Sequence, residues 1–173
     1  IFLTKGKIMD DRNRLFLSKS ILFLALAGVS SASLAADAES AVPPPAVFVK
    51  TAAQAGMTEV ELGKIALSKS QNSEVREFAE RMVKDHGKAN SELAMIAEGK
   101  GISAPKALDA EHQAMVDSLK SKTGADFDRE YSRHMNMDHS KAVALFESAS
   151  NSSDADFAGF ARAEGPQPPY DVF

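Results

Sequence analysis

Cysteine is absent from the 173 residues of this chain, and several kinds of chemistry are absent with it. No disulfide can form, no thiolate can bind zinc, and no cysteine nucleophile is available. The fold must therefore be stabilised by packing, and a chain of this length is long enough to bury one hydrophobic core.

Other common signatures are also missing from the sequence. No glycine-rich phosphate-binding loop is present, and none of the serines lies in a nucleophile motif. No segment shows the two-residue alternation and β-branched content that are typical of a strand. These absences favour an all-α fold and a non-enzymatic role.

Residues 1–35 have the pattern of a secretory signal peptide. Basic residues precede a short apolar run, ILFLALAGV at 21–29, and Ser33 and Ala35 supply the small side chains that signal peptidase requires. The apolar run is shorter than the roughly 20 residues that a membrane-spanning helix needs. We therefore expect an exported, periplasmic protein, cleaved after about Ala35, with no transmembrane anchor after cleavage.

Removal of this segment makes the chain more acidic. The whole chain has 20 Lys+Arg and 24 Asp+Glu, of which residues 36–173 retain 15 and 22. Because no basic patch remains, nucleic acid is not expected as a partner. The sequence does not identify another partner.

Helical periodicity runs through most of the remaining chain. Residues 36–46 are expected to form a Pro-rich linker, and residues 47–164 a single helical domain. Glycine and proline then end the last helix and leave 165–173 as an irregular tail. The expected helices are 47–70, 73–98, 109–122, 126–150 and 154–164.

Two internal similarities indicate how these helices are arranged. The segment MVKDHGKA at 82–89 resembles MNMDHSKA at 135–142, and the first helical hairpin resembles the last at an offset of 79 residues. Two hairpins joined by a long connection predict a ferritin-like four-helix bundle. The helix at 109–122 would then be a short crossover helix.

Three polar residues lie on the expected inward faces of the long helices. Glu59 is the one acidic residue in the apolar stripe of the first helix, and His86 lies in the stripe of the second. His139 lies near the stripe of the fourth helix, where the spacing fits either Asp138 or His139. Because an unpaired buried polar group is costly, we expect the three side chains to satisfy one another.

Two interpretations of this group remain open. The first is a hydrogen-bonded cluster with a purely structural role. The second is a metal site, since carboxylate and imidazole ligands on facing helices suit Fe, Mn, Zn or Cu. The paired Glu-x-x-His motifs of di-iron bundles are absent, because Val83 and Asn136 stand three residues before the two histidines. That absence favours the structural cluster.

Several segments of the chain resemble the DUF4142 family. They are AAQAGMTEVELGKIALSKSQNSEVREFAERMVKDHGKANSEL from Ala52, LDAEH from Leu108, GADFDREY from Gly124 and HSKAVALFE from His139. The resemblance covers residues 48–161. It implies an exported bacterial protein with a ferritin-like helical fold and no settled activity.

The resemblance also implies a longer last helix, with a histidine that would supply a fourth ligand. In this chain the helix is expected to end near Glu164, which we interpret as a truncated or frameshifted C-terminus. The groove left by the missing turns would be filled by the tail, through Tyr170 and Phe173, or by a second copy of the chain in a homo-oligomer.

The sequence thus predicts an exported ferritin-like helical bundle that serves as a non-enzymatic binding or envelope-stress module. The alternative is a metal-binding or redox protein that uses Glu59, His86 and His139.

Overall fold

The computed structural model describes residues 41–165, and within this range the chain forms five α-helices and no strand. The all-α prediction is confirmed. The predictions for the signal peptide, for linker residues 36–40 and for tail residues 166–173 concern residues outside the described range. The helices are α1 Pro45–Lys69, α2 Ser73–Gly99, α3 Ala110–Lys120, α4 Gly124–Ala149 and α5 Ala155–Glu164.

The helix ends follow from short polar residues and from proline. Asn72, Asp109 and Asp154 cap α2, α3 and α5, and the side chain of each accepts a hydrogen bond from a backbone N–H of the first turn. Helix α1 begins at Pro45, two residues earlier than expected. Proline fits this position because the first helical residues need no N–H donor.

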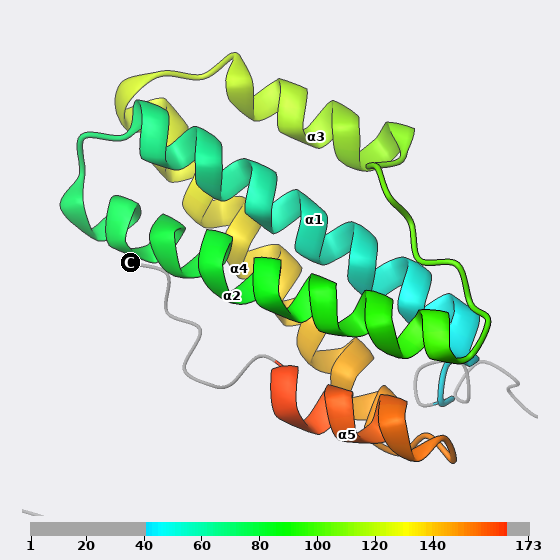
Figure 1. The fold of residues 1–173 in the computed structure, drawn as a ribbon. Helices are drawn as coiled ribbons and strands as arrows, with labels where there is room; N and C mark the ends of the chain where they lie inside the picture. The colour runs from blue at the N-terminus through cyan, green and yellow to red at the C-terminus, as the bar shows by residue number, and fades with distance from the viewer. Residues whose placement is uncertain (1–40, 166–173) are drawn as a thin grey trace, which may run out of the picture. The chain divides into compact units, whose positions relative to one another are not determined.

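Four of the helices form a bundle around a shared interior. Helix α1 packs against α2 and α4, while α5 packs against α4 and α2, so α1 lies diagonally across from α5 (Figure 1). Helix α3 lies on the outer side of α1 and links the two hairpins, as expected for a crossover helix. No described helix combines the length and the apolar character needed to cross a membrane.

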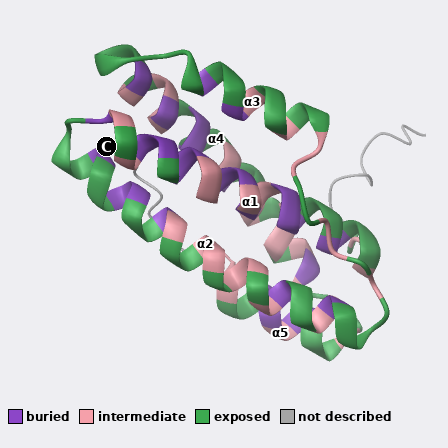
Figure 2. Cartoon of the chain, turned by 45° about the horizontal axis from the view of Figure 1, so that its top comes forward, coloured by how far each residue is buried: buried purple, intermediate pink, exposed green. Residues whose placement is uncertain are grey.

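The core consists of two apolar clusters at opposite ends of the bundle. One contains Leu62 and Ala66 of α1 with the first half of α2, the first half of α4 and the inner face of α3. The other contains Phe48 of α1 with the last turns of α2 and α4 and with Phe157 and Phe160 of α5. Since the start of α1 meets the ends of α2 and α4, α1 runs antiparallel to both (Figure 1). Buried residues, purple in Figure 2, recur along each of these helices.

Helix α1 is buried over a wider surface than a single narrow stripe. Gln54 and Thr58 lie outside the predicted stripe, yet they are 4% and 1% exposed. Gln54 donates to the carbonyl of Ala107 and accepts from the N–H of Asp109, each at 3.0 Å. These two bonds hold the crossover against α1, so α1 has neighbours on three sides.

Helix α5 is much shorter than its neighbours. Its 10 residues span about 15 Å, whereas the 27 residues of α2 span about 40 Å. Helix α5 therefore covers one apolar cluster and ends at Glu164, and it does not reach the other cluster.

Candidate metal centre

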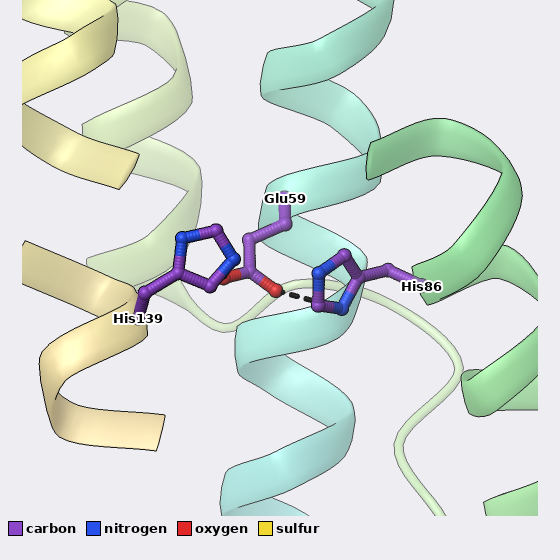
Figure 3. A group of neighbouring side chains, drawn as sticks. All are labelled: Glu59, His86 and His139. Carbon is purple, nitrogen blue, oxygen red and sulfur yellow. Dashed lines mark ion pairs between the residues drawn. The ribbon is translucent and has the colours of Figure 1, made fainter. Parts of the chain in front are cut away.

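Three polar side chains meet in the layer between the two apolar clusters. Glu59 comes from α1, His86 from α2 and His139 from α4, and the two imidazole rings lie on either side of the carboxylate (Figure 3). The structure thus brings together the three residues singled out in the sequence. The inward position of each residue follows from helical periodicity, because on its own helix each residue lies between members of the two apolar clusters.

The two histidines contact different oxygens of Glu59. His86 Nδ1 lies 2.9 Å from Oε2, which is hydrogen-bond distance, and His139 Nε2 lies 3.8 Å from Oε1. The ring centroids of the histidines are 5.9 Å apart. Glu59 and His139 are 2% and 6% exposed, while the side chain of His86 is 22% exposed and forms the solvent side of the group.

One oxygen of the buried carboxylate is not satisfied by hydrogen bonding. Among the described residues, Oε1 of Glu59 has no hydrogen-bond partner. A buried charged group with an unmet bond costs free energy, on the order of 1–3 kcal/mol or more. The cluster therefore contains a buried electron-pair donor whose hydrogen-bonding capacity is not used.

The environment shifts the pKa values of the two histidines in opposite directions. Burial lowers the pKa of His86, but the hydrogen bond and the charge of Glu59 outweigh it, so that the pKa lies above its ordinary value. For His139, burial dominates over the charge of Glu59, and the pKa lies below its ordinary value. The cluster is thus best described as a Glu59–His86 pair with a neutral imidazole beside it.

The spacing of the donor atoms is close to that of a metal site. One ligand atom from each of the three side chains can be chosen so that all lie within 4.8 Å of one another. Ligand atoms at about 2.1 Å from a tetrahedral zinc ion lie about 3.4 Å apart. A closure of up to about 1.4 Å, through side-chain rotations, would therefore bring the three atoms onto one ion.

A small cavity of about 30 Å³ adjoins the cluster. This volume holds one or two water molecules, since a water needs roughly 10–15 Å³ measured in the same way. Apolar residues of α1, α2, α4 and α5 form most of its wall, and its polar lining residues are Glu59, His86, Asn90 and Glu164.

Apolar and aromatic groups surround the rest of the cluster. The ring of Phe78 meets that of His139 edge-on, with centroids 6.0 Å apart. Tyr131 is fully buried, and its hydroxyl has no hydrogen-bond partner among the described residues. Burial and then the charge of Glu59 raise the pKa of Tyr131, so the phenol is neutral. Such surroundings strengthen electrostatic interactions within the cluster.

The remaining histidines and the neighbouring acids do not join the group. His112 Nδ1 contacts Asp109 at 2.6 Å on α3, and His134 Nε2 contacts Glu130 at 3.2 Å on α4. Asp138, which the sequence pattern could not separate from His139, pairs with a lysine one turn along its own helix. The structure therefore assigns the inward position to His139.

Glu164 is the lining residue that the sequence analysis did not single out as a candidate. It ends α5, and Phe157 and Ala161 precede it by seven and three residues on the buried face of that helix. This spacing is the signal that could have identified it, because residues three, four and seven apart share one helix face.

The fold and the site define a small all-α bundle with a carboxylate–imidazole cluster in its core. A family model described as "Domain of unknown function (DUF4142)" matches residues 30–167, and the chain belongs to this family. Comparison with curated proteins and with solved structures finds no match. Membership confirms the resemblance seen in the sequence, and the family description assigns no activity.

Proposed function

We propose that this protein is a metal-binding helical bundle in which Glu59, His86 and His139 hold one divalent transition-metal ion. The observation that carries the proposal is the meeting of three donors from three helices, with one buried carboxylate oxygen left without a hydrogen bond. A cation placed there would satisfy that oxygen and both imidazoles at once.

The donor set narrows the choice of metal. Two imidazoles and one carboxylate suit Zn²⁺, Fe²⁺, Mn²⁺ or Cu²⁺, and disfavour Ca²⁺ and Mg²⁺, which prefer oxygen ligands. Three protein ligands leave a fourth position open on a tetrahedral ion. The adjoining cavity is large enough for a bound water at that position. Because the three ligands include only one carboxylate, we propose that each chain binds one ion.

Metal binding would also explain why three long helices place polar residues in the middle of an otherwise apolar interior. The ion would link α1, α2 and α4 at one level, between the two apolar clusters. The role that follows is that of a binding module. Nothing in the geometry requires a catalysed reaction.

Metal content and affinity test the proposal directly. Untagged full-length protein is titrated with Zn²⁺ by calorimetry, and its metal content is measured by elemental analysis. We expect one Zn²⁺ per chain, and a loss of affinity greater than about 100-fold in Glu59→Gln and in His86→Gln, since outer partners of a metal alone are worth 10–100-fold. His112→Gln is the control, because that histidine pairs with Asp109 away from the cluster.

Zinc binding that survives Glu59→Gln at full strength would overturn the proposal, as would a wild-type chain that binds no Zn²⁺. The second result would favour a structural cluster, for which the 2.9 Å contact between His86 and Glu59 is the supporting observation. A structural pair of this kind can be replaced by well-packed apolar residues with little loss of stability. Glu59→Leu combined with His86→Leu would then unfold at about the wild-type temperature.

We further propose that the protein works after export, in the periplasm. The support is the basic, apolar and small-residue pattern of residues 1–35. The intact mass of protein recovered from the periplasm of a bacterial host should correspond to a chain that begins at Ala36. A recovered chain that keeps residues 21–29 would contradict cleavage.

A further inference from the structure

Glu164 reaches the candidate metal centre from the fourth helix of the bundle. It is the last residue of α5, and it lines the same 30 Å³ cavity as Glu59 and His86. A space of this size holds one or two waters, so Glu59, His86 and Glu164 border one small space.

The described partner of Glu164 is weakly held. Its Oε1 accepts from Lys88 Nζ at 3.0 Å, and the lysine side chain is 71% exposed whereas the glutamate is 19% exposed. An ion pair with so exposed a lysine contributes little to stability, because the Lys88 amine stays well solvated when the two groups separate. The carboxylate can therefore leave Lys88 at small cost.

The position of Glu164 is unfavourable for the helix that carries it. A negative side chain in the last turn of a helix opposes the helix dipole, which favours cations there. Local helix stability thus gives no reason for a carboxylate at this position. Its place in the lining of the cavity, together with Glu59 and His86, does give one.

We propose that Glu164 is a fourth protein ligand of the ion, and that Lys88 holds this carboxylate beside the site until metal enters. This inference rests on the proposed function and adds to it the identity of the group at the open coordination position. Two carboxylates and two neutral imidazoles match the charge of a divalent ion, and each bundle helix supplies one ligand. On binding, the carboxylate leaves Lys88 and displaces a water from the ion.

The test is a double-mutant cycle read by Zn²⁺ affinity and by the visible spectrum of bound Co²⁺. Glu164→Gln should weaken Zn²⁺ binding by more than about 100-fold, since the loss of an outer partner alone costs 10–100-fold. Lys88→Gln should tighten binding by up to about fivefold, because the competing partner is gone. In the double variant the Lys88 effect should vanish, since no carboxylate remains to be released.

The control is Glu61→Gln, which removes the same charge from a comparable lysine pair, Lys64 Nζ to Glu61 Oε1 at 2.7 Å, outside the cavity lining. It should leave Zn²⁺ affinity within about twofold of wild type. If Glu164→Gln lowers affinity no more than this control, Glu164 is not a ligand.

The Co²⁺ spectrum separates ligation from a distant charge effect. Loss of a ligand should shift the absorption bands and change their intensity in Glu164→Gln, whereas an unchanged spectrum with weaker binding would overturn ligation. Failure of this inference differs from failure of the proposed function. In the first case wild type and Glu164→Gln bind alike while Glu59→Gln does not bind, and in the second the wild type itself binds no metal.

Discussion

At the scale of single residues, two helical glycines differ in what surrounds them. A Cβ added at Gly63 of α1 would lie 2.9 Å from Val83 Cγ2 and 3.1 Å from the carbonyl oxygen of Ala79, both on α2. A Cβ added at Gly87 of α2 would meet nothing within 4 Å. The first glycine lets two helices approach closely, and the second lies against open space.

Alanine at these two positions should therefore have effects of opposite sign. Gly63→Ala should lower the free energy of unfolding by about 1–3 kcal/mol, because the helices must move apart. Gly87→Ala should raise it by about 0.5–1 kcal/mol, because alanine loses less backbone entropy in a helix. Urea unfolding of both variants measures this. Equal effects of the two substitutions would contradict the close α1–α2 contact.

The two cluster histidines should titrate differently in metal-free protein. The pKa of His86 is raised, so its contribution to stability is present below the pKa of the unfolded chain and is lost as pH rises through the folded-state value. The pKa of His139 is lowered, so its contribution is present above the unfolded pKa and is lost as pH falls. NMR titration of the ring signals should place His86 above His139.

Glu59→Gln is the matched variant for this titration. The carboxylate raises the pKa of both histidines, through a hydrogen bond and charge at His86 and through charge at His139. Both pKa values should therefore fall when it is neutralised, and His86 should fall further. Unchanged values in Glu59→Gln would show that the carboxylate does not contact the rings in solution.

At the scale of elements, the start of α5 depends on one aspartate. The Asp154 carboxylate accepts from the backbone N–H of Asp156 and of Phe157, and it also pairs with Lys100 Nζ at 2.8 Å. The lysine amine lies 5.7 Å from the centre of the Phe157 ring. Since α5 has 10 residues, too few for a stable isolated helix, it relies on this end and on its packing.

Asp154→Ala should destabilise α5 selectively, with faster amide exchange in Ala155–Glu164 than in the long helices. Asp154→Ser should lie between this variant and wild type, because serine keeps the cap and loses the ion pair. The hydrogen-bonded ion pair with Lys100 is the main reason that the pKa of Asp154 lies below its ordinary value. Its contribution is therefore present above the unfolded pKa and is lost as pH falls through the folded value. Uniform exchange changes across all helices would contradict a local role.

At the scale of the whole molecule, the proposed ion would make stability depend on metal. A ligand that binds the folded state alone stabilises it by about 2.7 kcal/mol at 100 times its dissociation constant. For a chain of this size, the melting temperature should rise by roughly 5–15 °C with excess Zn²⁺. A chelator should reverse the rise. Glu59→Gln should show no rise, and a rise of equal size in that variant would place the metal elsewhere.

The sequence was sufficient for the helices and for most of their inward faces. Residues three, four and seven apart determine which side of a helix is apolar, so Glu59 and His86 could be placed on inward faces by counting. The same counting could not choose between Asp138 and His139, which are adjacent and lie only about 100° apart around the helix. Packing of α4 against α1 and α2 decided for His139.

Contacts between distant parts of the chain were decided by the tertiary structure. Gln54 is buried because the crossover covers a third side of α1, which no pattern within α1 indicates. Glu164 is 105 residues from Glu59, and it reaches the same cavity because α5 ends at the level of the polar layer. Helix formation and amphipathicity depend on near neighbours along the chain, whereas which faces meet, and at what height, depends on how whole helices pack.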